Sequence, residues 1–250
     1  MMINIENNIF KTLKADYPIL VSKNFIKETH CKKILQEINT SKKFDDLVMN
    51  GRNRINKGSK NFDLFLKSSK YSAFFFSKLN NKKFYLNLLN QFEKNFQNLN
   101  LKQFKKWSFS KKNYGLQEGK KLTKFNFKKN TLNLDLDFSL SKKGYTRGVH
   151  RDRDTRIVNF LIYLNKVPKN SGGNLEIFSL KKNKKIVRFQ SKKNVTKLHT
   201  VKSFPGRSIF FLSLPNSYHA VSRLTTNTKR FFIYGSFSLN KIVKWKNFKK

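Results

Sequence analysis

The chain has 250 residues, and its 54 Lys and Arg residues against 14 Asp and Glu give a formal net charge of +40 at pH 7. A hydrophobic content of 38% and an aromatic content of 14% can build a sizeable core, which excludes a disordered basic tail and a collagen-like fibre. The single cysteine, Cys31, excludes an intrachain disulfide and a cysteine-based zinc site, and it is typical of a reducing compartment. No apolar run reaches the roughly 18 residues of a membrane span, and residues 1–14 lack the apolar stretch of a secretory signal. We therefore expect a cytoplasmic protein without a membrane span.

The positive charge can be interpreted in two ways. A surface of this charge attracts nucleic acids, anionic membranes and acidic metabolites, with binding that weakens as salt rises. Most of the charge, however, comes from lysines dispersed among abundant Asn, Phe and Ile. These residues have A- and T-rich codons, so an A/T-rich genome explains the charge without a dedicated partner. We favour this second interpretation, because specific readers of nucleic acid use arginine forks rather than dispersed lysines.

The first part of the chain predicts helices. Residues 17–21 form a short apolar run typical of a strand, and apolar residues recur at helical spacing over 27–39, which places Cys31 in the core. The Lys- and Asn-rich stretch 49–69 contains two glycines and predicts an irregular connection. A second helix is expected within 73–96, where four apolar residues fall on one face and predict core packing rather than a stacking surface for bases: Tyr85, Leu89, Phe92 and Phe96.

The hydrophobic period changes to two after Thr131. Apolar and polar side chains alternate over 132–140, which predicts a strand with one buried face. Short strands separated by turn residues are then expected over 145–152, 157–164, 175–178, 186–189, 208–214, 218–224 and 230–239. Because this spacing is typical of a sandwich or barrel, we expect a mainly β fold with helices at its N-terminal side.

Two residues of ligand type, His150 and Asp152, lie two positions apart, which places them on one face of an extended segment. The pair alone is weak evidence, because exposed hydrogen-bonding pairs share this spacing and Asp154 is a competing acid. His219, at the start of a later strand, strengthens the case, since two imidazoles and a carboxylate can occupy three positions around Fe(II) and leave three open. Arg230, at the start of the next strand, can grip a carboxylate in a bidentate fashion.

Six motifs occur in an order shared with a known family. They are His150-x-Asp152, Ile162-Tyr163-Leu164-Asn165, Gly172-Gly173-Asn174-Leu175, Pro205-Gly206-Arg207 before Phe210-Phe211, His219 and Arg230. In this order and spacing they resemble the iron(II)- and 2-oxoglutarate-dependent dioxygenases, in particular the prolyl-hydroxylase-like branch. The resemblance covers residues 135–239, and the strand at 17–21 followed by the Cys31 helix is similar to the usual lead-in of that branch.

The resemblance implies a double-stranded β-helix core of the jelly-roll or cupin type, with the metal inside its open end. We therefore expect one oxygenase domain over residues 1–250. Its N-terminal helical part, over about 1–125, would pack on the β-helix core over about 130–240.

The resemblance also implies roles for particular residues. The iron ligands would be His150, Asp152 and His219. Arg230 would bind the distal carboxylate of 2-oxoglutarate, and Tyr163 would donate its hydroxyl to the same carboxylate. Tyr234 shares a strand face with Arg230 and is a second candidate for lining the cofactor pocket. Without the resemblance, Tyr163 would be interpreted as a core tyrosine with a satisfied hydroxyl.

Other polar features have plainer explanations. Asn159 lies two strand periods before Tyr163 and is a weaker candidate for facing inward with it. His199 has no partner at ligand spacing and His30 opens a helix, so we expect the first to be structural and the second to be solvated. Gly172-Gly173 is first of all a turn requirement, because glycine reaches positive φ without strain.

The implied cofactors are Fe(II), the cosubstrate 2-oxoglutarate and O2, with ascorbate as a candidate stimulant. The implied reaction hydroxylates an unactivated C–H bond and releases succinate and CO2, and the carboxylate of Asp152 takes the metal position that a halide would need. The expected substrate is a peptidyl proline or an amino-acid-like small molecule, although fold does not settle function.

Four arginines, Arg147, Arg151, Arg153 and Arg156, lie within ten residues around the His-x-Asp pair. Arg151 and Arg153 should alternate away from the two ligands on an extended segment. They either line a rim that attracts an anionic substrate or form a solvated basic rim, and the sequence leaves both interpretations open.

A different class of function is a non-catalytic basic jelly-roll module that binds nucleic acid or another polyanion. Such a module predicts the loss of at least one ligand residue, and all three are present. A nucleic-acid demethylase would carry a second arginine shortly after Arg230, where this chain has Phe231-Phe232-Ile233-Tyr234-Gly235-Ser236. We therefore favour an oxygenase, and the sequence predicts no oligomeric state.

Overall fold

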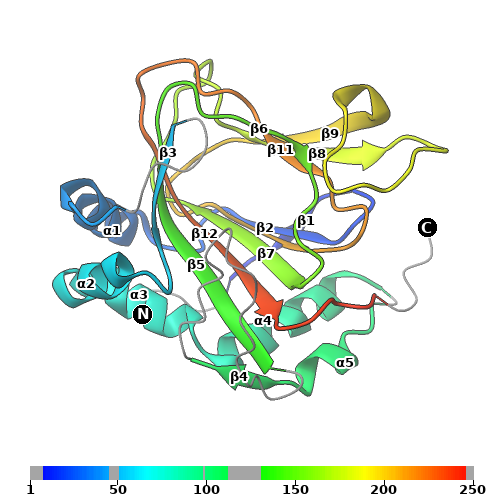
Figure 1. Ribbon diagram of the computed structural model, residues 1–250, viewed down its shortest axis with the longest axis horizontal. Coiled ribbons are helices and arrows are strands. Elements are labelled where there is room, and N and C mark those ends of the chain that lie inside the picture. Colours follow the sequence, from blue (N-terminus) through cyan, green and yellow to red (C-terminus); the bar gives the residue numbers. More distant parts are fainter. Residues whose placement is uncertain (1–7, 45–50, 98, 112–130, 246–250) are drawn as a thin grey trace.

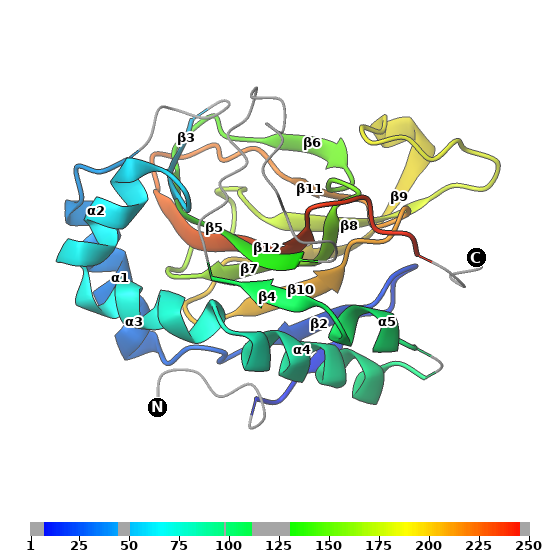
Figure 2. The ribbon, with the colours of Figure 1, turned by 60° about the horizontal axis from the view of Figure 1, so that its bottom comes forward.

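Two β-sheets face each other in the computed structural model, which describes residues 8–44, 51–97, 99–111 and 131–245. Figure 1 shows the smaller sheet above the larger one, and Figure 2 shows the helices along the outer side of the larger sheet. The arrangement is the double-stranded β-helix, or jelly roll, expected from the sequence. No helix in the described ranges is both long and apolar enough to cross a membrane.

The larger sheet contains eight strands, seven of them in a continuous order. That order is β1 (Lys11–Thr12), β2 (Ile19–Ser22), β10 (Ser208–Leu212), β7 (Arg156–Tyr163), β12 (Arg230–Leu239), β5 (Thr131–Ser141) and β3 (Arg52–Asn56). Neighbours on this path are antiparallel, and β4 (Ser108–Ser110) pairs with the start of β5 in parallel. The register places Arg230 beside Ser141 of β5 and Phe232 beside Tyr163 of β7, so the start of β12 lies in the middle of the sheet.

The smaller sheet has the order β6 (Arg147–His150), β11 (His219–Val221), β8 (Leu175–Leu180) and β9 (Val195–Val201), and a short 3-10 helix, η1 (Lys192–Asn194), precedes β9. His219 pairs directly with His150 across β11 and β6. The register therefore brings together two histidines that are far apart in the sequence.

In the described residues between β2 and β4 there are five helices, the first separated from the others by β3: α1 (Glu28–Thr40), α2 (Lys60–Ser68), α3 (Lys70–Leu79), α4 (Lys82–Asn95) and α5 (Lys102–Lys105). The helix expected over 27–39 is confirmed as α1, with Cys31 fully buried. The helix expected within 73–96 is two helices, because the chain breaks at Asn80 and the Asn81 side chain caps α4 by accepting from the Lys83 backbone N–H.

Helices pack on the outer face of the larger sheet mainly through aromatic rings. Phe237 of β12 contacts Tyr85 of α4 with a centroid separation of 5.0 Å, and Phe138 of β5 contacts Phe65 of α2 at 5.2 Å. Buried aromatic side chains are large hydrophobic contributors, and these edge and tilted pairs add specificity to the packing. The stripe of apolar residues predicted within 73–96 therefore belongs to the hydrophobic core, where Phe96 is only partly buried.

A half-buried carboxylate joins two of the helices. Glu37 of α1 accepts the backbone N–H groups of Tyr71 at 2.9 Å and Ser72 at 2.8 Å, together with the Ser72 hydroxyl at 2.7 Å. These donors belong to the first turn of α3, whose N–H groups have no partner within the helix. Glu37 thus caps α3 from another helix and fixes the angle between the two.

Three sequence predictions of local structure are wrong. The described part of 49–69 contains β3 and α2 rather than an irregular connection, because Arg52 and Arg54 face the inside of the β-helix and make the strand look polar. Ser59 supplies the cap of α2 by accepting from the Phe62 N–H. The expected strand over 186–189 is reduced to one bridge between Phe189 and His150.

The third wrong prediction is that the strand over 132–140, which is part of β5, has only one buried face. Its apolar side packs toward the helices as expected, but Asp137 and Ser139 on the other side are also buried. They point into the β-helix, where Arg52 donates to Asp137 at 2.8 Å and to Ser139 at 2.9 Å. The sequence analysis also missed β9, whose middle residues are mostly exposed.

Candidate metal centre and cosubstrate pocket

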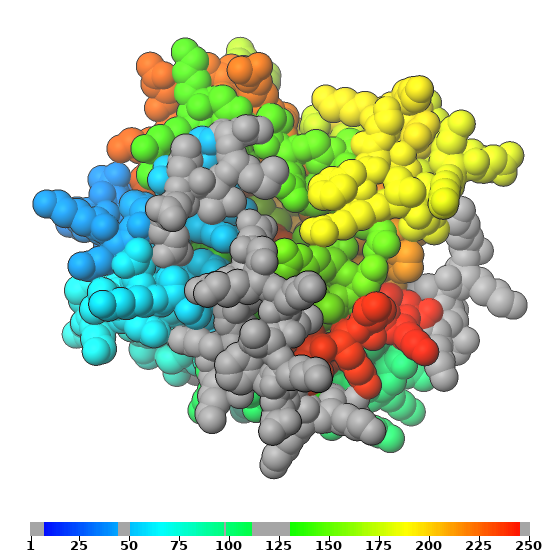
Figure 3. All heavy atoms as spheres, viewed as in Figure 1, coloured from blue at the N-terminus to red at the C-terminus, as the bar shows by residue number. Residues whose placement is uncertain are grey.

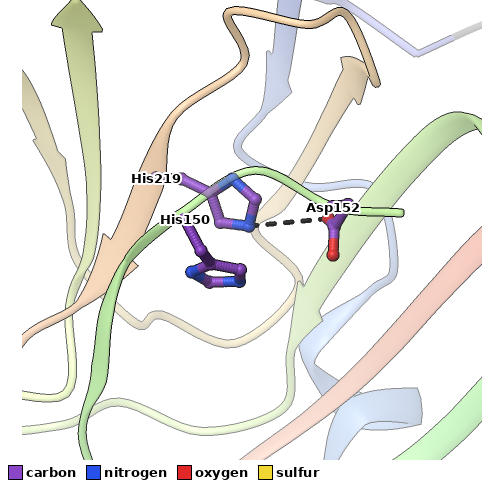
Figure 4. Close-up of side chains that lie close together, drawn as sticks. All are labelled: His150, Asp152 and His219. Carbon is purple, nitrogen blue, oxygen red and sulfur yellow. Dashed lines mark ion pairs between the residues drawn. The ribbon is translucent and has the colours of Figure 1, made fainter. Parts of the chain in front are cut away.

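Three ligand-type side chains converge at the ends of β6 and β11 (Figure 4). His150 ends β6, His219 begins β11, and their ring centroids are 4.4 Å apart. Asp152 follows β6 by two residues, and one potential ligand atom from each side chain lies within 4.8 Å of the others. All three are buried. The structure therefore brings together the three residues that the sequence singled out as iron ligands.

Backbone carbonyls orient both imidazole rings. Nδ1 of His150 lies 2.8 Å from the Gly148 carbonyl oxygen, and Nδ1 of His219 lies 3.1 Å from the Ser217 carbonyl oxygen. Because a carbonyl only accepts, Nδ1 carries the proton and Nε2 keeps its lone pair. His219 Nε2 then lies 3.5 Å from Asp152 Oδ2. Hydrogen bonds of this kind hold metal-binding histidines in the correct tautomer.

The electrostatics keep the three groups in the protonation states that a metal needs. Burial, followed by the charge of His219, lowers the pKa of His150 to about 3, and burial also lowers the pKa of His219. Burial alone would raise the pKa of Asp152, but Arg156 and the two histidines together hold it well below its usual range. At neutral pH the centre therefore offers two neutral imidazoles and one carboxylate.

The two oxygens of Asp152 have different surroundings. Oδ1 accepts from Arg156 Nη1 at 2.5 Å and from the Tyr234 hydroxyl at 3.0 Å. Oδ2 has no hydrogen-bond partner among the described residues, although it is buried. One oxygen is thus anchored, and the other is left for a ligand between the histidines. Tyr234 lines the same cavity as Arg230, but its hydroxyl is engaged with Asp152 and Arg156.

Arg230 is a buried cation whose charge is uncompensated. Its exposure is 0%, and within the described ranges none of its three guanidinium nitrogens has a hydrogen-bond partner. Its Cζ lies 4.1 Å from the centroid of the Phe232 ring and 5.1 Å from that of Tyr163. Such an arrangement is costly unless a ligand completes it, because a buried cation needs an anion or several acceptors.

The Tyr163 hydroxyl is beside Arg230 and shares its lack of a hydrogen-bond partner in the described part of the chain. Burial raises the pKa of Tyr163 despite the opposing charge of Arg230, so the hydroxyl stays protonated and can donate. Arg230 and Tyr163 together present donors to one buried point, which suits a carboxylate.

The glycine pair borders this point. Gly172 and Gly173 have φ of +71° and +68°, a conformation that favours glycine, and a Cβ on Gly172 would lie 1.8 Å from the Arg223 carbonyl oxygen. A Cβ on Gly173 would lie 3.2 Å from Cδ of Arg230. The two glycines therefore form the turn expected from the sequence, and Gly173 also lies next to Arg230.

The centre and Arg230 open into one cavity of about 150 Å³ between the two sheets. Its walls include His150, Asp152, His219, Arg230 and Tyr234. Arg153 of the predicted basic rim also lines it.

The other predicted residues lie elsewhere. Arg151 is paired with Asp154, which is exposed and does not join the ligand group. Asn159 is fully buried on the inner face of β7, and its amide lacks a hydrogen-bond partner among the residues described. His199 contacts the Lys14 carbonyl oxygen at 2.7 Å, away from the centre.

Sequence reasoning missed two kinds of functional candidate. Arg156 was noted only as a member of an arginine cluster, yet it holds the Asp152 carboxylate from four residues away. Arg52, Arg54 and Arg188 also line the cavity, and they come from segments expected to be irregular or strand-like at the surface. The only signal for them was that arginine is rare among the basic residues of this chain.

Comparisons with known proteins agree with this geometry. Residues 136–238 match the family model described as the 2OG-Fe(II) oxygenase superfamily. No curated protein matches the chain at a significant level.

Solved structures share the fold. A Pseudomonas putida prolyl-4-hydroxylase is 17% identical with a TM-score of 0.50, and the match covers 90% of this chain and 94% of that one. A structure of prolyl 4-hydroxylases from Phytophthora capsici is 12% identical with a TM-score of 0.52, over 90% of this chain and 60% of that one. Residues 136–238 are therefore similar to the 2OG-Fe(II) oxygenase superfamily, and the chain shares its fold with the two prolyl-4-hydroxylase structures.

Proposed function

We propose that this protein is a hydroxylase in which His150, Asp152 and His219 hold Fe(II), and Arg230 binds the distal carboxylate of 2-oxoglutarate. The observation that carries the proposal is the fully buried, unsatisfied guanidinium of Arg230 opening into the same cavity as the three ligand-type side chains. When bound, iron and 2-oxoglutarate supply oxidative decarboxylation to succinate and CO2, coupled to hydroxylation of a substrate C–H bond.

The donor set fits Fe(II). Two imidazole nitrogens and one carboxylate oxygen on adjacent segments match the ligand type and number of a facial triad. Arg156 and Tyr234 hold Oδ1 of Asp152, which fixes the direction of Oδ2 without placing a second ligand oxygen at the metal. Arg156 and Tyr234 are therefore positioning residues in this proposal.

The pocket around Arg230 fits a carboxylate. The planar guanidinium can bind both oxygens, and the Tyr163 hydroxyl can donate a further hydrogen bond. Phe232 and Tyr163 flank the guanidinium with their rings and limit its movement. These residues would orient 2-oxoglutarate toward the metal centre and exclude water from its distal end.

The proposed substrate is a peptidyl proline or an amino-acid-like small molecule. The proposal is supported by the similarity to the structure titled as a Pseudomonas putida prolyl-4-hydroxylase. The carboxylate of Asp152 would occupy the metal position that a halogenating enzyme leaves for a halide, which supports hydroxylation as the reaction. Ascorbate stimulation, a single oxygenase domain over the whole chain and a cytoplasmic location stay predictions from the sequence.

Anaerobic visible spectroscopy tests the proposal without knowledge of the substrate. A charge-transfer band should appear only when the purified protein receives both Fe(II) and 2-oxoglutarate. His219→Ala should abolish the band, and Arg230→Met should require at least about a hundredfold more 2-oxoglutarate, as expected for losing a buried charged pair. Lys102→Gln, an exposed substitution on α5, should leave the band unchanged. A folded wild-type protein that gives no band would contradict the proposal.

A further inference from the structure

Arginine is concentrated around the cavity to an extent that the composition does not explain. The chain has ten arginines and 44 lysines. Seven of the ten arginines line the cavity, whereas Lys57 is the one lysine among the described residues that does so. An A/T-rich genome accounts for dispersed lysine, but it does not gather arginines from distant segments around one site. The arginines of the cavity therefore require a separate explanation.

The charges of the cavity do not balance. Its described lining contains these eight cationic side chains and three carboxylates, Asp135, Asp137 and Asp152. Asp137 pairs with Arg52 at 2.8 Å, and Asp152 pairs with Arg156 at 2.5 Å. Bound Fe(II) and the doubly negative 2-oxoglutarate would cancel each other, so the described lining would keep its excess of five positive charges in the loaded enzyme. A surplus of this sign favours a further anion.

Three of these arginines lie at the mouth of the cavity. Arg147 and Arg153 are partly exposed and Arg188 is exposed, while all three line the cavity with the metal centre. Burial, and after it the charges of Arg153 and Arg147, lower the pKa of the Arg188 guanidinium. We call these three the mouth arginines; Arg188 is thus near enough to Arg147 and Arg153 to be repelled by them, and an anion beside Arg188 would relieve that repulsion.

The segment that carries Arg188 is held in place beside the metal centre. We call residues 187–190 the rim segment, whose yellow atoms lie beside the green atoms of β6 in Figure 3. The Tyr218 hydroxyl donates to the Val187 carbonyl oxygen at 2.7 Å and accepts from the Val187 N–H at 3.0 Å. Backbone hydrogen bonds also run from Arg151 N to Arg188 O and from Gln190 N to Val149 O, both at 2.9 Å. The position of Arg188 is therefore fixed by the strands of the metal ligands.

An exposed aromatic ring completes the mouth. Phe189 is 59% exposed, and its ring stacks on that of His150 with a centroid separation of 6.4 Å. The guanidinium carbon of Arg188 lies 5.2 Å from this ring, and that of Arg147 lies 5.7 Å from it. Such rings hold arginine side chains flat and limit the freedom they lose when they bind an anion.

We propose that the substrate hydroxylated at this centre carries a carboxylate or phosphate group, and that the mouth arginines Arg147, Arg153 and Arg188 bind that group. The inference rests on the proposed function, because it assigns a substrate class to the same site. Arg230 and the mouth arginines then have separate tasks: Arg230 binds the cosubstrate in the interior, and the mouth arginines select the substrate at the surface.

Calorimetric titration of the anaerobic protein, loaded with Fe(II) and 2-oxoglutarate, tests this inference with three peptides. The first has a glutamate on each side of a single proline, the second has glutamines there, and the third has phosphoserines. We expect the glutamate or phosphoserine peptide to bind at least about tenfold more tightly than the glutamine peptide. The stronger of the two anionic peptides identifies the carboxylate or the phosphate as the preferred group.

The surface charge of the protein requires a matched control. The double variant Arg153→Gln, Arg188→Gln should lose at least about tenfold in affinity for the anionic peptide. The variant Lys102→Gln, Lys106→Gln removes the same charge from exposed positions at α5 and should lose less than about twofold, because it acts only through the long-range field. Equal losses in the two variants, or anionic peptides that bind no better than the glutamine peptide, would overturn the inference.

The same samples separate the two proposals. If the wild-type protein gives the Fe(II)–2-oxoglutarate band but does not discriminate the peptides by charge, the anionic substrate is wrong and the oxygenase stands. If the band is missing, the proposed function itself fails, whatever the peptides do.

Discussion

The two sheets of the β-helix differ in what covers them. The outer face of the larger sheet is packed under the helices in a continuous core that includes Phe138 and Phe237. The smaller sheet has a separate cluster of five buried hydrophobic residues, Val149, Phe178, Val195, Tyr218 and Ala220. It nevertheless carries both histidines and the rim segment. The larger hydrophobic core thus lies mainly on one side of the cavity, and the two candidate histidine ligands lie on the other.

Two arginines of the cavity show the same division at the level of single side chains. Arg156 is paired with a carboxylate, whereas Arg230 has no partner in the described structure. A charge that belongs to the folded framework has its counterion within the chain, and a charge that serves a ligand is left without one. The unsatisfied guanidinium of Arg230 therefore marks a point in the cavity that an anionic ligand would complete.

The largest expected effect is on the larger sheet. Phe237→Ala should destabilise the protein by about 3–5 kcal/mol, because it leaves a cavity among closely packed aromatic rings. Phe189→Ala, at an exposed position beside the smaller sheet, should change stability by less than about 0.5 kcal/mol. Urea unfolding of both variants measures the difference. Similar losses in the two would show that the sheets do not divide stability as described.

Substitution by methionine should change stability in opposite directions at Arg230 and Arg156. Arg230→Met should leave the ligand-free protein as stable or more stable by about 1–3 kcal/mol, since it removes an uncompensated buried charge, while 2-oxoglutarate binding is weakened at least about a hundredfold. Arg156→Met should destabilise it by about 2–3 kcal/mol, because Asp152 would lose its counterion. Thermal unfolding with and without 2-oxoglutarate checks both. Marked destabilisation by Arg230→Met would assign Arg230 to the framework instead.

Acid should destabilise the metal-free protein through its histidines. The pKa of His150 is lowered to about 3 and that of His219 is also lowered, so the unfolded chain binds more protons than the folded one once the pH falls below about 6.5. Each histidine should then remove about 1.4 kcal/mol per pH unit until its folded pKa is reached. Urea unfolding in EDTA between pH 7 and pH 5 measures the slope, which His219→Asn should reduce. A flat profile would contradict these pKa shifts.

A smaller effect is expected at the contact between helices. Glu37→Gln should lower stability by about 1–2 kcal/mol, because the charge that caps α3 is lost while the shape is retained. Glu28→Gln removes a carboxylate from an exposed ion pair and should have almost no effect. Thermal denaturation compares the two, and the Fe(II)–2-oxoglutarate band should be unchanged in both. Loss of the band in Glu37→Gln would link the helices to the site more closely than we describe.

Strands with strong patterns were the most predictable part of the fold. The range 230–239 expected for the last strand agrees with β12, because an apolar alternation begins at a basic residue after a clear turn. β3 was missed because its inward side chains are arginines that are buried only against partners from other segments. The break between α3 and α4 was missed because hydrophobic periodicity continues across Asn80 and Asn81.

The candidate site was predictable where residue type and spacing suffice. His-x-Asp and the later histidine follow a local pattern, so the sequence named the residues that the fold brings together. The contact of Tyr234 with Asp152 spans 82 residues, and it depends on where β12 crosses the cavity. The mouth arginines are likewise assembled by sheet register, which no short sequence pattern records.

The most direct test of the account is a crystal structure of the anaerobic protein with Fe(II) and 2-oxoglutarate, in which anomalous scattering locates the iron. The account predicts iron bound by Nε2 of His150, Nε2 of His219 and Oδ2 of Asp152, with the distal carboxylate of 2-oxoglutarate on Arg230 and Tyr163. Iron at another position, or 2-oxoglutarate held by the mouth arginines while Arg230 keeps no partner, would contradict it.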